Sequence, residues 1–344
     1  MFLLTITGTA GVFFLPDSSG LGGAGGFYRH YPPNLLSESW YLNLTDPTQY
    51  IAGYSPSSVF LAGRQKADSI TRIELRSAAS AGYVIPVPTD RKLVWSAARI
   101  RIDSPYIYLT EHISRYYSAR RWGAAMPIQS DQGGLQGIQQ LLSLSPYRIA
   151  VRTYDTTRLQ NVLQVLNTDH RPVSPDGVYV PDKQRDGVFC TDGILKYDSE
   201  SALVLYVYNY RNRFVLLDTT LKVRLTATTI DTTDQVNFTV GSFTDKNTVT
   251  SSFSSPPRMV NKNAFFNNSF IFIHSALMSD NEKPSDFRRT SVLDIYRVAD
   301  GKYVYSVKVP DDKGEKVRDF IVSGDRLLLL YGSGMICYRI ALPG

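Results

Sequence analysis

Carboxylates and arginines near the starts of predicted inner strands are the side chains of this sequence best placed to share a polar site. Paired carboxylates can hydrolyse glycosides without histidine. If the expected strands surround one axis, eight residues would form a mixed-charge axial pocket that suits an anionic or sugar-like ligand: Arg99, Arg101, Asp186, Asp192, Asn261, Asn263, Arg318 and Asp319. A plainer interpretation stands beside this one, because the Asp-Gly pairs at 186–187 and 192–193 are common turn chemistry.

The four histidines do not form a recognisable catalytic or metal-binding group. His30, His112, His170 and His274 are far apart, and no two share a repeat unit in a way that suggests a triad or ligation. His274 ends an apolar run and is expected in the core. The sequence also lacks GxSxG, HExxH and P-loop patterns, and no GxGxxG precedes a helix. We therefore expect no catalytic residue, no metal site and no cofactor.

A second candidate site is a segment in which cations alternate with aromatic side chains. Exposed together, such side chains stack on bases or sugars and pair with phosphates. The segment contributes Arg115, Tyr116, Tyr117, Arg120, Arg121 and Trp122 to a surface patch. The alternative is an outer strand whose rings pack between sheets while its arginines remain in solvent.

The elements that would position these residues repeat along the chain. A polar turn followed by a dense apolar run occurs six times, with runs that begin at Val59, Tyr106, Tyr147, Leu203, Phe270 and Leu327. Each run is preceded by a strand and followed by a more amphipathic one, such as Thr71–Leu75. The shorter intervals between the starts of successive runs fit repeat units of about 40–50 residues, the length of one blade of a β-propeller. The longer intervals need insertions. The clearest are Gln235–Pro257, in which an extra hairpin is expected at Val236–Ser242, and Met278–Thr290.

These repeats predict an all-β fold, a β-propeller, with six blades favoured over seven. The most complete unit contains four strand-like runs: Gly187–Lys196, Ala202–Tyr210, Arg213–Leu217 and Leu221–Thr228. The last unit, Lys316–Ile340, has room for only three strands, so Trp40–Leu44 is expected to supply the fourth and close the ring. Closure by both chain ends removes exposed strand edges. The propeller domain is expected to span residues 39–344.

Residues 1–38 are expected to lie outside this domain. Met1–Leu15 carries no charge, and Asp17–Gly26 reads as a flexible spacer. Met1–Leu15 is either what remains of an export signal or anchor, or a strand of the domain. We favour the first interpretation, which places the folded part outside the cytoplasm, in the periplasm or at the cell surface, with a tether at its N-terminus.

Charge and cysteine content narrow the classes of partner. The formal net charge of +6 is modest for 344 residues, and the cations are scattered rather than gathered on one element, so nucleic acid is not an expected partner. Cys190 and Cys337 lie in hydrophobic runs of non-adjacent units. We expect buried free thiols rather than a disulfide.

The six units, with turn-and-strand signals such as Asp186–Gly193 and Ser323–Leu327, resemble the TolB-like six-bladed β-propellers. More narrowly, the chain is similar to uncharacterised exported bacterial propeller proteins that carry an N-terminal anchor. The resemblance covers about Ser39–Gly344. It implies an extracytoplasmic location and a monomeric body that meets a membrane only through its N-terminus, and it brings no catalytic residues.

These features favour a non-enzymatic binding or scaffolding module that presents one propeller face to a ligand or a protein, the expected protein partner being another envelope protein. The loops Gln235–Pro257 and Met278–Thr290 would take part in that presentation. The alternative is an enzyme, or a subunit of a redox complex, with a polar axial site acting on an anionic or sugar-like substrate. A propeller fold by itself is compatible with both.

Overall fold

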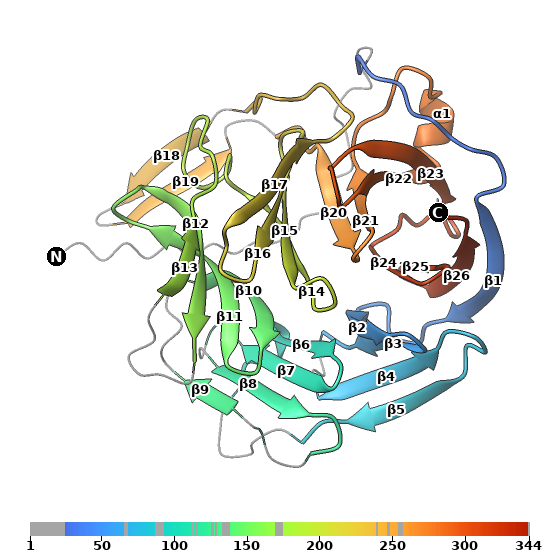
Figure 1. The fold of residues 1–344 in the computed structure, drawn as a ribbon, viewed down its shortest axis with the longest axis horizontal. Coiled ribbons are helices and arrows are strands. Elements are labelled where there is room, and N and C mark those ends of the chain that lie inside the picture. Colours follow the sequence, from blue (N-terminus) through green and yellow to red (C-terminus); the bar gives the residue numbers. More distant parts are fainter. Residues whose placement is uncertain are drawn as a thin grey trace.

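The computed structural model describes residues 25–64, 68–86, 93–111, 113, 116–124, 127, 129–132, 138–168, 175–238, 240–245, 248–253 and 257–342. In these residues the chain forms six four-stranded antiparallel units arranged in a ring around one axis (Figure 1). We number the units 1 to 6 in chain order. The expectation of an all-β fold built from small twisted sheets is confirmed.

The strands of each unit follow one another along the chain. Unit 1 contains β2 (Tyr50–Ser55), β3 (Ser58–Ala62), β4 (Ser69–Glu74) and β5 (Ser80–Val84). Unit 2 contains β6 (Ala98–Asp103), β7 (Tyr106–Glu111), β8 (Tyr116–Arg121) and β9 (Gln129–Gln132), after the short 3-10 helix η1 (Trp95–Ala97). Unit 3 contains β10 (Ile138–Ser145), β11 (Arg148–Asp155), β12 (Gln160–Asn167) and β13 (Pro175–Tyr179).

Units 4 to 6 complete the ring. Unit 4 contains β14 (Gly193–Asp198), β15 (Leu203–Tyr208), β16 (Arg213–Asp218) and β17 (Val223–Thr228). Unit 5 contains β20 (Asn261–Phe266), β21 (Phe270–Ser275), β22 (Thr290–Arg297) and β23 (Tyr303–Pro310), with α1 (Pro284–Phe287) between β21 and β22. Unit 6 contains β24 (Asp319–Ser323), β25 (Arg326–Leu330), β26 (Gly334–Ile340) and β1 (Leu36–Asn43).

The second strand of each unit carries the apolar run that the sequence repeats. In β3 every residue is buried, and in β15, β21 and β25 every residue after the first is buried. Both faces of such a strand are covered because each sheet packs between two neighbouring sheets. By contrast, the outermost strands β5 and β17 are mainly exposed. The contrast between buried middle strands and wetter outer strands follows from this stacking.

Shared apolar clusters hold neighbouring units together around the whole ring. Phe60 and Ile70 of unit 1 pack with Ile100 and Ile107 of unit 2, and Tyr108 and Tyr117 of unit 2 with Ile149 and Val151 of unit 3. Leu163 of unit 3 packs in one cluster with Val204 of unit 4. Phe214 of unit 4 packs in another cluster with Phe266 of unit 5. A third, larger cluster joins units 5, 6 and 1. The ring is therefore closed by side-chain packing as well as by strand pairing.

The N-terminal strand β1 completes unit 6, as the sequence predicted. It pairs antiparallel with β26, and Trp40 lies opposite Cys337. The indole Nε1 of Trp40 also donates a hydrogen bond to the carbonyl oxygen of Leu75 in unit 1, at 2.8 Å. β1 begins at Leu36 rather than at the expected Trp40, so its pairing with β26 is longer than expected.

The described part of the N-terminal segment is docked on unit 5, which differs from the linker expected over residues 1–38. The side chain of Arg29 is fully buried and pairs with Glu282 and Asp294. The backbone N–H of Asp280 donates to the carbonyl oxygen of Phe27 at 2.9 Å. Residues 27–31 thus belong to the folded body, while the apolar stretch Met1–Leu15 lies outside the described residues.

Two other local expectations are revised by turns and insertions. The run expected from Gly187 becomes a strand only at Gly193, because the Asp186 carboxylate accepts hydrogen bonds from the N–H groups of Val188 (2.8 Å) and Phe189 (2.5 Å) and holds a turn. Cys190 therefore lies in that turn and not in a strand. Both cysteines are buried and free, as expected. The insertion after unit 4 does contain a hairpin, but it lies later than the expected Val236–Ser242, with strands β18 (Val240–Asp245) and β19 (Thr248–Phe253).

Candidate functional site

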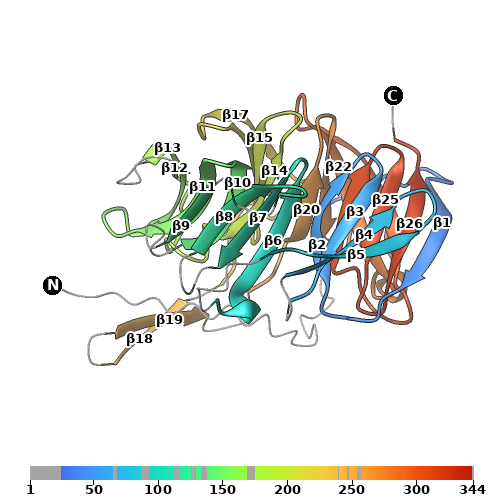
Figure 2. The ribbon, with the colours of Figure 1, turned by 90° about the horizontal axis from the view of Figure 1, so that it is seen from below.

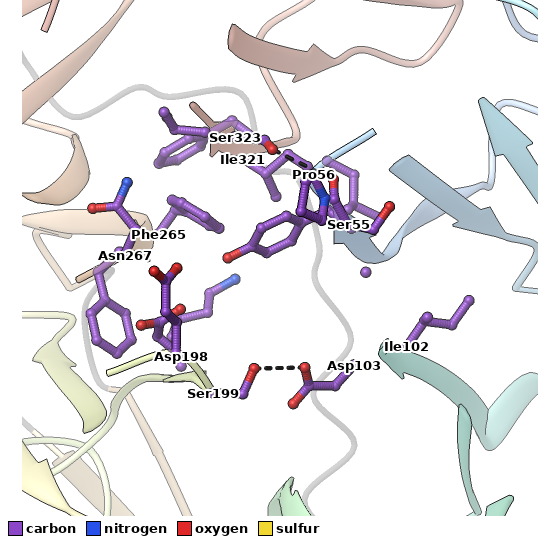
Figure 3. Close-up of a pocket in the computed structure, with 18 of the residues that line it drawn as sticks. Ser55, Pro56, Ile102, Asp103, Asp198, Ser199, Phe265, Asn267, Ile321 and Ser323 are labelled. Atoms are coloured by element: carbon purple, nitrogen blue, oxygen red, sulfur yellow. Dashed lines mark hydrogen bonds between the residues drawn. The ribbon is translucent and has the colours of Figure 1, made fainter. Parts of the chain in front are cut away.

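A hollow in the described part of the structure lies on the ring axis. It is a cavity of about 1670 Å³ lined by residues of all six innermost strands, β2, β6, β10, β14, β20 and β24 (Figure 3). The lining continues into the turns that follow five of these strands, including Ser55–Ser57, Ser199–Glu200 and Asn267–Ser269. We call this hollow the axial cavity, and the end of the ring formed by these turns the turn face.

The opposite end of the ring is the entry face, where the chain enters each innermost strand. The two long insertions lie there, because one joins β17 to β20 and the other joins β21 to β22. Figure 2 shows the hairpin β18–β19 below the body on that side. The docked residues 27–31 contact the second insertion and so lie on the entry face as well. The axial cavity and the insertion loops thus belong to opposite faces.

Close backbone contact between units 1 and 2 forms one wall of the axial cavity. β2 and β6 pair in parallel, with Gly53 opposite Ile102 and Tyr54 opposite Asp103. A Cβ atom at Gly53 would lie 2.0 Å from the carbonyl oxygen of Ile102, so only glycine permits this approach. The pairing fixes the positions of Tyr54 and Asp103 relative to each other.

Side chains of β6 reach unit 4 across the axial cavity. The guanidinium Nη2 of Arg101 donates to the carbonyl oxygen of Tyr197 at 3.3 Å, and its Cζ lies 5.7 Å from the centre of the Tyr197 ring. Figure 3 shows Ser199 and Asp103 pointing toward one another, where Ser199 Oγ donates to Asp103 Oδ1 at 2.8 Å. Units 2 and 4 therefore meet directly near the turn face.

The electrostatics of this wall are set by burial around Arg101. Burial lowers the pKa of the Arg101 guanidinium, and the nearby Asp103 carboxylate offsets that effect only in part. Among the described residues, no ion pair joins Arg101 to a carboxylate, and its guanidinium makes one hydrogen bond, to the carbonyl oxygen of Tyr197. Arg101 is thus a cation whose hydrogen-bonding capacity is mostly unused by described residues.

An aromatic group lies beside this cation. Tyr54 is half-buried, and its ring packs edge-on against Phe265 with a centroid distance of 5.5 Å. Burial raises the pKa of Tyr54 to about 12, and the negative charges of Asp198 and Asp103 add to the effect. The hydroxyl of Tyr54 therefore stays protonated at neutral pH and can donate a hydrogen bond.

Two of the eight axial residues expected from the sequence line the axial cavity, namely Arg101 and Asp319. Asp319 Oδ1 accepts a hydrogen bond from Asn263 Nδ2 at 2.8 Å, so Asn263, a third residue of the set, lies next to Asp319. Arg99 is on the same strand as Arg101 but donates to the carbonyl oxygens of Ser96 and Ala98 at the entry face.

The remaining four residues of that set have structural contacts of their own. Asp186 holds the turn before β14, and Asp192 pairs with Arg152. Asn261 is buried and donates to the carbonyl oxygen of Tyr208 at 2.8 Å. Arg318 donates to the carbonyl oxygens of Pro47 and Gln49. These residues stand at or before the starts of their strands, whereas the axial cavity extends to the strand ends.

Several residues that line the axial cavity but were not expected from the sequence share one position in the repeat. Tyr54, Asp103, Asp198 and Ser323 each lie at or next to the last residue of an innermost strand, just before the polar turn. The signal was present, because the polar turn before each apolar run marks where the preceding strand ends. Residues immediately before those turns could have been chosen instead of residues at strand starts.

The expected basic and aromatic surface patch is not formed. Tyr116, Tyr117 and Arg120 are buried, because β8 lies inside the sheet of unit 2, between unit 1, which packs against Tyr116, and unit 3, which packs against Tyr117. Arg121 and Trp122 are exposed, and Trp122 packs against the Phe60 ring at 5.2 Å. Arg115 lies outside the described residues. The alternative interpretation, an outer strand whose rings pack between sheets, describes Tyr117 correctly, but Arg120 is not solvated.

Other titratable groups do not add to the site. His274 is buried in β21, as expected for a core histidine, and burial lowers its pKa to about 3. His112 and His170 lie outside the described residues. Within the described residues, no group of three or more His, Cys, Asp or Glu side chains is placed to hold a metal ion. No helix of the described chain is both long and apolar enough to cross a membrane.

A closed ring of small antiparallel sheets around an axial cavity defines a β-propeller. One solved structure supports this fold: a member of the DUF4221 family from Bacteroides vulgatus is similar with a TM-score of 0.52 and 11% identity, over 89% of this chain and 95% of that one. The C-terminal WD40 domain of Sif2 is similar at a TM-score of 0.42 and 7% identity (90% and 99% covered). The β-propeller domain of Cps50 (Swd1) from Myceliophteria thermophila gives 0.44 and 8% (89% and 100%).

No protein-family model and no curated protein matches the sequence. At 11% identity, the similarity to the Bacteroides structure shows the fold and nothing finer. The chemistry of the axial cavity must therefore be argued from its own residues.

Proposed function

We propose that this protein is a non-enzymatic binding module whose binding surface is the turn face, with the axial cavity at its centre. The observation that carries the proposal is the cavity of about 1670 Å³ to which all six innermost strands contribute. Concave sites lined by apolar walls and a few polar groups are where proteins commonly hold ligands. Rigid strands on every side hold the lining in place, so a partner or ligand would meet a preformed surface.

Two carboxylates near the turn face, those of Asp103 and Asp198, favour binding over catalysis, because each holds a structural hydrogen bond. Asp198 Oδ2 accepts hydrogen bonds from the backbone N–H (2.9 Å) and Oγ (2.6 Å) of Ser201, and so holds the turn between β14 and β15. Asp103 accepts the hydrogen bond from Ser199. Groups that hold turns are suited to orienting a ligand and keep acceptor capacity for it.

The proposal includes an extracytoplasmic location, with a tether at the N-terminus. It is supported by the uncharged stretch Met1–Leu15 and by the docking of Arg29 on the entry face, away from the axial cavity. A tether there would leave the turn face pointing away from a membrane. The narrower kinship with TolB-like propellers and with exported bacterial propellers belongs to the same proposal. Alkaline phosphatase fused after Gly344 would be active only if the body is exported; a fusion active solely inside the cell would contradict this location.

A photo-crosslinking experiment tests which face binds. A photoreactive amino acid is placed at Asn268 or Asp325, both exposed on the turn face, and at Lys283, exposed on the entry face, as the matched control. In cells of the source organism, we expect one defined adduct from the two turn-face positions and none from Lys283. Adducts formed equally from both faces, or none from the turn face, would refute the assignment. Recovery of the bound molecule in a chemically altered form would refute its non-enzymatic part.

A further inference from the structure

Arg101 is the feature of the axial cavity that points to a particular ligand chemistry. Its guanidinium has five N–H donors, and the described residues occupy one of them, through the carbonyl oxygen of Tyr197 at 3.3 Å. Its flat side lies near the Tyr197 ring, at 5.7 Å. A planar guanidinium with free edges matches the geometry of a carboxylate, which it can bind through two parallel hydrogen bonds. The cavity wall thus offers a place for one negative group.

The surroundings of Arg101 limit how much negative charge a ligand can bring. Asp103 lies two residues further along β6, and Asp198 is next to Tyr197, whose carbonyl holds Arg101. Both carboxylates line the same cavity. These two carboxylates would repel a doubly charged phosphate more strongly than a singly charged carboxylate that pairs with Arg101. The local charge therefore favours a monocarboxylate over a phosphate.

The same carboxylates and rings suit the uncharged part of a sugar. An ionised carboxylate has about four acceptor positions, and the Ser199 hydrogen bond occupies one position of Asp103. Sugar hydroxyl groups can donate to the remaining positions. Tyr54, beside Arg101, and Phe265, which packs against it, present aromatic surface to the cavity, and the cavity volume exceeds the roughly 300–1,000 Å³ of common small-ligand sites. There is space for more than one sugar ring.

We propose that the axial cavity binds a saccharide that carries a carboxylate, with Arg101 holding the carboxylate and Asp103 and Asp198 accepting hydrogen bonds from sugar hydroxyls. This inference rests on the proposed function, since it assumes that the axial cavity is the binding site. It adds the chemical class of the ligand and the residue that selects it.

Calorimetric titration of the full chain with defined probes tests this selection. The probes are the disaccharide of glucuronic acid linked to glucose, the methyl ester of that disaccharide, and inorganic phosphate. We expect the acid to bind at least about 10-fold more tightly than the ester, because a charged hydrogen-bonded pair contributes about 10- to 100-fold in affinity. R101Q should weaken binding of the acid by the same factor and leave binding of the ester unchanged.

Arg99→Gln is the matched control, because Arg99 is on the same strand but does not line the axial cavity. It should bind all three probes as the wild type does. R101K keeps the charge and loses the planar fork, so we expect intermediate affinity for the acid. Thermal melting of each variant checks folding, and the comparison of acid with ester on the wild type does not depend on any variant.

Equal affinity for acid and ester, tighter binding of phosphate, equal losses in R101Q and R99Q, or no binding of the disaccharides would each overturn the inference. These results leave the proposed function standing if crosslinks still form from Asn268 and Asp325. Loss of those turn-face crosslinks would instead refute the proposed function. The two experiments therefore fail separately.

Discussion

Replacing Arg29 with methionine should destabilise the protein strongly, because the side chain lies in a buried ionic cluster. Its Nε and Nη2 donate to Asp294 at 2.7 and 3.0 Å, and its Nη1 donates to Glu282 at 2.7 Å and to the carbonyl oxygen of Leu277 at 2.9 Å. The three charged side chains are between 0% and 3% exposed. Removing the cation leaves two carboxylates buried and unpaired, a change that typically costs about 3–5 kcal/mol.

Urea unfolding followed by fluorescence measures this loss. For a chain of this size the denaturant dependence is at least about 3 kcal/mol per molar urea, so the midpoint of R29M should fall by roughly 1 M. The matched control is Arg297→Met, which removes an exposed pair with the same 2.7 Å separation, between Arg297 and Asp300. That variant should unfold like the wild type. The triple variant R29M/E282Q/D294N should be more stable than R29M, because it removes the orphaned charges.

The pH dependence of the stability difference between wild type and R29M gives an independent check. Burial by itself would raise the pKa of Glu282, but the charge of Arg29 and hydrogen bonds from Ser279 and Tyr31 outweigh it and hold that pKa below its ordinary value. The stabilising contribution of Glu282 is therefore present above the ordinary pKa and is lost as pH falls through the lower folded value. In R29M the buried carboxylates lack the cation, so they take up protons above their ordinary pKa. The difference between wild type and R29M should therefore begin to shrink as pH falls towards about 4.3 and should shrink further below it. A midpoint of R29M equal to that of R297M at pH 7 would refute this reasoning.

Two further predictions concern close packing and a buried histidine. Gly53→Ala should lower the melting temperature, because the added Cβ would clash with the carbonyl oxygen of Ile102. Gly82→Ala is the control and should leave the melting temperature unchanged, because the space around its Cβ is open. Equal melting temperatures for the two variants would contradict the close approach of β2 and β6. His274 has a pKa lowered to about 3 by burial, so folding loses stability as pH falls below about 6.5, by up to roughly 1.4 kcal/mol per pH unit. The free energy of unfolding is measured by urea titration between pH 7 and 5. In H274Q it should fall less steeply with decreasing pH than in the wild type. An equal dependence on pH in both proteins would show that His274 is not buried in its neutral form.

The repeated pattern of the sequence predicted most of the fold, because it depends on local features. The six apolar runs lie in or next to the second strands of the six units, and the alternating runs after them become third strands. Even the partner of the incomplete last unit was predictable, since three strands in Lys316–Ile340 require a fourth and Trp40 precedes the first complete unit. Strand periodicity and polar turns depend on residues that are adjacent in the sequence, so they can be predicted without tertiary information.

The burial of single side chains depended on neighbours that the sequence does not place. Tyr116 and Arg120 have the composition of an exposed patch, yet the strand that carries them is covered by unit 1 on the side of Tyr116 and by unit 3 on the other side. Arg29 follows a glycine-rich stretch that predicts a linker, but its carboxylate partners lie about 250 residues further along the chain. Packing across such separations cannot be inferred from local periodicity.

By itself, then, the sequence determined a ring of small sheets closed by the N-terminal strand, because hydrophobic alternation and turn residues act over a few positions. The tertiary structure alone decided where the ring is hollow. Arg101 and Tyr197 are 96 positions apart and meet only because units 2 and 4 converge near the turn face. A binding cavity is a property of side chains brought together from several units, so its chemistry appears only when the units are in place.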